Sequence, residues 1–219
     1  MAAEPDQVLL TTLTTEHFTL QGARSQIVSE STGRSALYLG AVSSALISLG
    51  FVADASGDSD LFRVFTLIVL PTLYTLGMFT FVRLVELSIE GIFYGRAINR
   101  IRHYYVEHAG ASARYFLLSG HDDAPGVLRN MGITVTRWQL YFTASSAIAV
   151  VNSVVGGAAV GFAVGIAFDP PLGASVAAGA VVALGSFALH MRADRARHER
   201  GVSLEPLFPS SPGESRPVD

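Results

Sequence analysis

The chain has no cysteine and no lysine, and charged residues make up only 15% of its 219 residues. Without cysteine it can form no disulfide, no thiol nucleophile and no thiolate metal site. Without lysine it cannot build the phosphate-binding loop in which a lysine contacts the nucleotide phosphates. About a quarter of the residues of a soluble domain are charged, so the low charge content argues against such a domain. The net charge of −3 gives a nucleic-acid partner no electrostatic support.

The charges are segregated, which leaves four long uncharged runs. Each run can cross a hydrocarbon core of about 30 Å as a helix that rises about 1.5 Å per residue. The third run exceeds the length of one upright helix, so we expect it to tilt or to place its ends among the headgroups, with two short helices as the alternative. The sequence thus predicts an all-α polytopic membrane protein with four transmembrane helices, at residues 35–53, 64–82, 138–168 and 171–191.

Arginines lie almost entirely on one side of the predicted spans. Of the 15 arginines, only Arg63 falls in a loop on the other side, together with three aspartates. Basic residues accumulate on the cytoplasmic side of membrane proteins, so both termini are predicted to lie in the cytoplasm, at a bacterial inner membrane. Trp138 and Tyr141 are expected to anchor the inner end of the third span. Contacts with anionic lipid headgroups are expected from the basic cluster that follows the fourth span, Arg192, Arg195, Arg197 and Arg200.

The first two spans are predicted to extend into the cytoplasm as helices. Apolar residues recur at spacings of three, four and seven over residues 84–108, and Leu20, Ala23 and Ile27 form a similar stripe within residues 16–34. Each stripe alone would face water, so we expect the two helices to pair as an antiparallel stalk, to which a cytoplasmic protein partner can bind. A first helix that lies flat on the membrane surface is the alternative.

Three features complete the predicted cytoplasmic part, which comprises residues 1–34, 83–137 and 192–219. Gly110 is expected to end the long helix, and Asp122 or Asp123 to cap a short helix that Gly132 closes. The segment 201–219 is rich in proline and serine and is predicted to be disordered. Ion pairs are expected at the membrane edge among Arg34, Arg83, Glu86 and Glu90.

Small residues form stripes along three of the spans, at spacings of four on the first and third and on one side of the fourth. Such stripes let helix backbones approach closely, either within one subunit or between the subunits of a homo-oligomer. The third span carries Gly157, Gly161 and Gly165, and the first carries Ala36, Gly40, Ser44 and Ser48. On the fourth span the corresponding residues are Ala174, Ala178 and Gly185.

Polar groups within the spans are candidates for the lining of a water-filled path. Ser44, Ser48 and Asn152 are the residues selected for this role, with hydrogen bonds to their own backbone or between helices as the alternative. Pro71 lies inside the second span, where we expect a kink and not a break. Most of the runs lack any ionisable group, which argues against a proton- or sodium-coupled transporter.

No catalytic residue, cofactor or metal is predicted. The pair His103 and Glu107 and the sequence His121-Asp122-Asp123 each supply an incomplete set of metal ligands. Paired acid–base groups or nucleophiles at the inner interface are also missing from the sequence pattern, which argues against a membrane enzyme.

Three segments carry a resemblance to known proteins. HFTLQGARSQIVSESTGRS, FVRLVELSIEG and INRIRHYYVEH resemble uncharacterised small multi-span membrane proteins of GC-rich bacteria. The layout is similar to that of two- and four-span membrane effectors of bacterial conflict systems, which implies a pore but assigns no residue a role. We therefore expect a non-enzymatic, oligomeric membrane protein that forms or gates a permeation path through its cytoplasmic helices. The alternative is a membrane-anchored scaffold or regulatory subunit without a pore.

Overall fold

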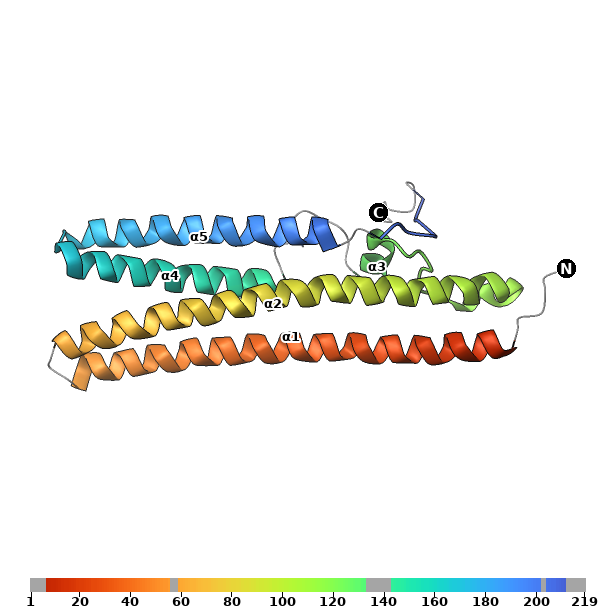
Figure 1. Ribbon diagram of the computed structural model, residues 1–219, viewed down its shortest axis with the longest axis horizontal. Coiled ribbons are helices and arrows are strands. Elements are labelled where there is room, and N and C mark those ends of the chain that lie inside the picture. Colours follow the sequence, from red (N-terminus) through yellow and green to blue (C-terminus); the bar gives the residue numbers. More distant parts are fainter. Residues whose placement is uncertain (1–6, 56–58, 133–142, 202–203, 212–219) are drawn as a thin grey trace. The chain divides into compact units, whose positions relative to one another are not determined.

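The computed structural model describes residues 7–55, 59–132, 143–201 and 204–211, and every regular element in these ranges is helical. Four of the helices are long and apolar enough to cross a membrane, which confirms the prediction of an all-α chain with four candidate spans. Insertion in a membrane, orientation and the cytoplasmic location of the extensions stay predictions. The elements are α1 (Gln7–Ala55), α2 (Ser59–His108), the 3-10 helix η1 (Gly110–Tyr115), α3 (Ala124–Asn130), α4 (Ala144–Phe168) and α5 (Leu172–Gly201) (Figure 1).

The chain divides into two compact units, and α1 and α2 contribute to both. We call the first the extension unit, which comprises Met1–Glu30, Leu87–Tyr141 and Arg200–Asp219. The second, the span unit, comprises Ser31–Glu86 and Phe142–Glu199 and contains the apolar stretch of each long helix. Each unit is described separately below.

The third span begins later than the uncharged run predicts. Thr143 caps α4, since its Oγ1 accepts a hydrogen bond from the Ser146 N–H at 3.2 Å. The helix has 25 residues, which is long enough for one span, and it runs unbroken through Gly156 and Gly157. The predicted anchors Trp138 and Tyr141 lie outside the described residues.

α4 and α5 pack closely against each other as a hairpin. A Cβ atom added to Gly157 would lie 2.5 Å from the Gly179 carbonyl oxygen, and one added to Gly161 would lie 2.9 Å from the Ser175 carbonyl oxygen. The two backbones are therefore in contact where the glycines remove side chains. On α5, the small residues that face α4 are Ser175, Gly179 and Ala183, whereas Gly185 of the predicted stripe has no neighbour within 4 Å of its Cβ position. A contact of that stripe between subunits stays a prediction.

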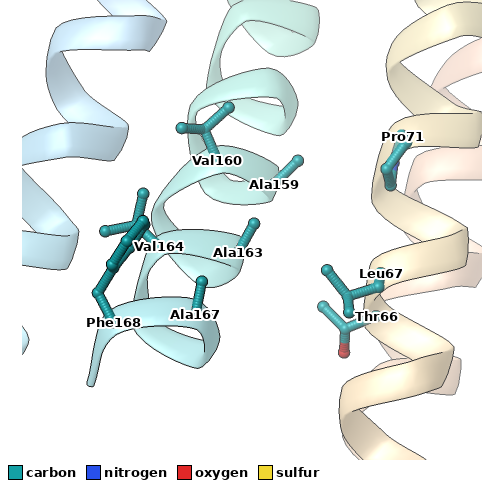
Figure 2. Close-up of a pocket in the computed structure, with 9 residues that line it drawn as sticks. All are labelled: Thr66, Leu67, Pro71, Ala159, Val160, Ala163, Val164, Ala167 and Phe168. Atoms are coloured by element: carbon teal, nitrogen blue, oxygen red, sulfur yellow. The ribbon is translucent and has the colours of Figure 1, made fainter. Parts of the chain in front are cut away.

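α2 continues as a helix through Pro71, so the proline does not end the span. Beside it, an apolar cleft of about 350 Å³ lies between α2 and α4. Figure 2 shows Leu67 and Pro71 of α2 on one side of this cleft and Ala159 and Ala163 of α4 on the other.

The extension unit pairs the start of α1 with the end of α2. The Ile27 side chain lies 3.9 Å from the position of a Cβ on Gly91, and the rings of His17 and Tyr105 are 5.9 Å apart. Lower residue numbers on α1 thus face higher numbers on α2, which is the predicted antiparallel arrangement. Leu20 and Ala23 of the predicted stripe are half-buried.

The segment after α2 follows the predicted turns. Gly110 has a φ of 52° and Gly132 a φ of 70°, both in the left-handed region that favours glycine. Asp123 caps α3, because its Oδ1 accepts a hydrogen bond from the Gly126 N–H at 2.8 Å. These turns place Asp122 and Asp123 beside the last turns of α2.

Candidate functional site

A cluster of polar side chains is buried inside the span unit. Asn152 of α4 is 0% exposed and His190 of α5 is 2% exposed. The Tyr38 hydroxyl donates a hydrogen bond to Asn152 Oδ1 at 3.0 Å. On the other side of the amide, Asn152 Nδ2 lies 3.4 Å from His190 Nε2. Three helices of the span unit therefore contribute to one hydrogen-bonded chain.

Ser186 joins this chain to a second tyrosine. Its hydroxyl lies 3.2 Å from the Tyr74 hydroxyl and accepts a hydrogen bond from Ser153 at 3.3 Å. The Phe81 ring meets His190 edge to face, with ring centroids 4.6 Å apart. The cluster thus has polar contacts within it and an aromatic wall beside the imidazole.

The contacts of His190 determine which ring nitrogen carries the proton. Its Nδ1 lies 2.7 Å from the Ser186 carbonyl oxygen, which can only accept a hydrogen bond. A neutral His190 therefore carries its proton on Nδ1, and Nε2 accepts from the Asn152 amide. The hydrogen bonds then run in one direction, from Tyr38 through Asn152 and His190 to Ser186.

Two glycines make room for the cluster. A Cβ on Gly77 would overlap the Asn152 amide and lie 2.6 Å from the Tyr38 hydroxyl. A Cβ on Gly156 would lie 2.6 Å from the Tyr74 ring. Large polar side chains from one helix thus occupy the space that these glycines leave on another.

The cluster lies near the arginine-flanked ends of the spans. Tyr38 follows Arg34 by four residues, and His190 precedes Arg192 by two. At about 1.5 Å per residue, these side chains are about one helical turn inside the ends that the arginines mark. A pathway from that end to His190 would therefore be short.

The structure does not bring the candidate pore-lining residues together within one chain. Asn152 is buried in the cluster, whereas Ser44 and Ser48 lie on the exposed face of α1. The Ser48 hydroxyl donates to the Ser44 carbonyl at 2.9 Å, which is the predicted alternative for these serines. Ala36 and Gly40 share this exposed face, and nothing lies within 4 Å of the Gly40 Cβ position.

The remaining predicted site residues are those of the ion pairs at the membrane edge and those of the basic cluster. Arg83 pairs with Glu86 at 3.6 Å, one of the expected ion pairs, and pairing of Arg34 with Glu90 or Glu86 stays a prediction. The basic cluster is helical because α5 extends to Gly201. Contacts of its arginines with lipid headgroups stay a prediction.

A second site lies in the extension unit, where residues 204–211 dock against the loop before α3. The predicted disorder is wrong for these residues. Asp122, 0% exposed, accepts hydrogen bonds from the Leu207 N–H at 3.1 Å and from the Phe208 N–H at 2.7 Å. Asp123 Oδ2 accepts from both the N–H and the hydroxyl of Ser210, at 2.7 and 2.6 Å.

The electrostatics of the docking site favour ionised carboxylates. Burial alone would raise the pKa of Asp122, but hydrogen bonds from Phe208, Arg100 and Leu207 hold this pKa below its usual value. Burial opposes ionisation of Asp123 in the same way, and the hydrogen bonds from Ser210 and Gly126 lower its pKa. Both groups are thus committed to hydrogen bonding, and no group of three metal-ligating side chains occurs in the described ranges.

His190 is the residue that the sequence interpretation misses. It lies in the fourth run, which counts as uncharged only because histidine is neutral at pH 7. The useful signal is the spacing of Ser186 and His190, four residues apart, which places both on one face of an apolar helix. The four uncharged runs contain no aspartate or glutamate.

No protein-family model, curated protein or solved structure matches the chain. The function therefore has to be inferred from the two sites.

Proposed function

We propose that the protein is a non-enzymatic, oligomeric membrane protein whose spans form or gate a permeation path. The observation that carries the proposal is the buried chain of Tyr38, Asn152, His190 and Ser186 within four apolar helices. An ionisable side chain among membrane spans is costly and marks ion or proton pathways in membrane proteins. Near the arginine-flanked ends, such a group can respond to the pH on one side of the membrane.

Protonation of His190 conflicts with the hydrogen bonds that surround it. A charged imidazole donates from both nitrogens, so Nε2–H would point at the Asn152 amide group that already donates to it. The conflict is relieved if the Asn152 amide flips. Its oxygen then accepts from His190 Nε2, and its NH₂ group points toward Tyr38. A single proton therefore reverses the direction of two hydrogen bonds, since the Tyr38 hydroxyl can accept as well as donate.

The hydrogen bonds of His190 in the described ranges go to uncharged groups. Among the described residues, the hydrogen-bond partners of His190 are the Asn152 amide and the hydroxyl and carbonyl of Ser186. The cluster also contains the hydroxyl groups of Tyr38 from α1 and Tyr74 from α2. A buried imidazolium would thus draw water or an anion into the cluster, which is the first step in opening a path.

Two surfaces of the span unit support association of copies. The face of α1 with Ala36, Gly40, Ser44 and Ser48 is exposed along its length. An apolar groove of about 690 Å³ runs along the α4–α5 hairpin, lined in part by Gly161, Val176 and Ala180. A stripe of small residues fits a groove of this kind, because helix backbones can then approach closely.

Ion flux into liposomes tests the proposal. Liposomes with the purified protein should release an enclosed anionic or cationic dye, whose fluorescence does not depend on pH, and the release should be faster at lower pH. His190→Gln should remove this pH response, and His108→Gln, at an exposed position, serves as the control. Absence of flux from the wild type at every pH, in liposomes where the protein is oligomeric, would exclude the pore.

The second candidate is a membrane-anchored scaffold or regulatory subunit without a pore. It is favoured by the docking site of the extension unit, where a peptide segment is held by well-formed polar contacts. In that case liposomes stay tight, and a protein partner co-purifies with the full chain in a defined stoichiometry.

A further inference from the structure

The docked segment 204–211 is bound mainly through its backbone. Asp122 uses its carboxylate to accept two successive N–H groups, and its own N–H donates to the Phe208 carbonyl at 3.2 Å. Arg96 donates from Nη2 to the Leu204 carbonyl. The segment bends at Leu207 and Phe208, so that both N–H groups point at one carboxylate. Successive N–H groups in a turn bind an anionic group whatever the side chains are.

Two side chains of the segment add selectivity. The Phe208 ring stacks on His103, with centroids 3.7 Å apart and planes at 14°. The Ser210 hydroxyl donates to Asp123 at 2.6 Å. In contrast, Leu204 and Leu207 are 57% and 62% exposed and leave their side chains in solvent. The site therefore selects an aromatic residue followed two positions later by a serine.

The residues of the site are held by contacts that do not involve the segment. Arg100 Nε donates to Asp122 Oδ2 at 2.8 Å, and Arg96 Nε donates to the Asp122 carbonyl at 2.7 Å. Asn99 Nδ2 donates to the His121 carbonyl at 2.8 Å. Asp123 also caps α3. The docking surface thus keeps its shape when the segment leaves, and its two carboxylates remain ready to accept N–H groups.

We propose that this surface is a binding site for peptides with an aromatic-x-Ser pattern that bend at the aromatic residue, and that residues 204–211 are its resident, exchangeable ligand. The segment is tethered to the site, which gives it an effective concentration on the order of millimolar. It therefore occupies the site at rest. A peptide with the same pattern supplied from outside has to displace it. This inference holds whether or not the spans conduct ions.

The test compares the full chain with a variant truncated after Gly201, both in nanodiscs. The probe is a fluorescein-labelled synthetic peptide with the sequence of residues 202–213, and its anisotropy is measured against protein concentration. The truncated protein should bind the peptide roughly 10–100-fold more tightly than the full chain, as expected for a tethered competitor. Equal binding to both proteins would overturn the proposal, because the resident segment would then not occupy the site.

Matched variants of the peptide and of the protein show where the peptide binds. In the peptide, Phe208→Ala and Ser210→Ala should each weaken binding, whereas Glu205→Ala, at an exposed position, should not. In the truncated protein, Asp122→Asn should weaken binding at least about tenfold, and Glu107→Gln is the control at an exposed position. Binding that is unchanged by Asp122→Asn would place the peptide elsewhere and overturn the assignment.

A second measurement uses the full chain, so its result does not depend on whether the truncated protein folds. In the full chain, the amides of Leu207, Phe208 and Ser210 should exchange slowly with deuterium, because each donates to a carboxylate. Excess unlabelled peptide should speed their exchange, and the Phe208→Ala peptide should not. Slow exchange that no peptide concentration changes would show that the segment is a permanent part of the fold and would overturn its role as an exchangeable ligand.

Discussion

Asn152 is a fully buried amide with a hydrogen-bond partner at each end. It is fully buried, its oxygen accepts from Tyr38 and its NH₂ group lies against His190. An amide in an apolar interior is stable only with both ends satisfied, and here each end meets a side chain from a different helix. Residue identity at this position thus matters to α1, α4 and α5 together.

Replacing Asn152 with alanine should therefore destabilise the protein. The change leaves the Tyr38 hydroxyl and His190 Nε2 without their partner, at a cost of about 1–3 kcal/mol for each buried polar group. Ser48→Ala should have almost no effect, because that serine is exposed and bonds its own helix. Thermal unfolding in detergent, followed by circular dichroism, gives the comparison. A variant Asn152→Ala as stable as the wild type would mean that the cluster contributes little to packing.

The docked segment should detach in acid and not near neutral pH. The folded-state pKa values of Asp122 and Asp123 are below their usual values, so their contribution is complete above the ordinary aspartate pKa of about 3.9 and is lost as the pH falls through the lower folded values. Because the chain has no cysteine, a nitroxide on Glu205→Cys reports the mobility of the segment directly. Release already between pH 7 and 6 would contradict this prediction.

At the scale of elements, the existence of the four long helices could be predicted because crossing a bilayer depends on local sequence. The face that α5 presents to α4 could not. Small residues occur on every side of the first three turns of α5. Which side contacts α4 is determined by Gly157 and Gly161 of α4, where the two backbones meet. The docking of residues 204–211 could not be predicted from the sequence either, since the carboxylates that bind them lie more than 80 residues away in the sequence.

The α4–α5 hairpin should tolerate no side chain at Gly161. A leucine there would enter the space where the backbones of Ser175 and Gly179 lie, and overpacking of this kind costs about 1–3 kcal/mol. Gly173→Leu serves as a control within the hairpin, because nothing lies within 4 Å of its Cβ position. Chemical unfolding of both variants in mixed micelles gives the difference. Equal stability would mean that the hairpin is looser than the contacts around Gly161 indicate.

At the scale of the whole molecule, the arginine distribution predicts the orientation of the chain. Reporter fusions after Gly57 and after Pro171 should be active outside the cytoplasm, and fusions after Ala111 and after Gly201 inside it, because basic residues are retained on the cytoplasmic side. The described helices agree with an even number of spans. A cytoplasmic signal from the fusion after Gly57 would contradict the predicted topology.

The proposed pore depends on association of copies. Contact between the exposed face of α1 and the groove of the α4–α5 hairpin would join two different surfaces, and a heterologous contact of this kind closes into a ring when its rotation permits. Ser44 and Ser48 lie on the α1 face that would take part, so in a ring they lie beside the subunit boundary. Only in such an assembly can these exposed serines and the cluster around Asn152 belong to one path.

Gly40→Leu should therefore reduce the mass of the particle without unfolding the chain. Within one chain nothing lies within 4 Å of the Gly40 Cβ position, so the added side chain has room, but it would stand between two backbones at a contact between copies. Gly50→Leu is the matched control, because Gly50 is on the same helix, also has no neighbour within 4 Å and lies outside the stripe. Native mass spectrometry from nanodiscs measures both. Equal masses for the two variants would exclude the α1 stripe as the interface, and a monomeric wild type across several lipids would remove the oligomer and with it the path that Ser44 and Ser48 would line.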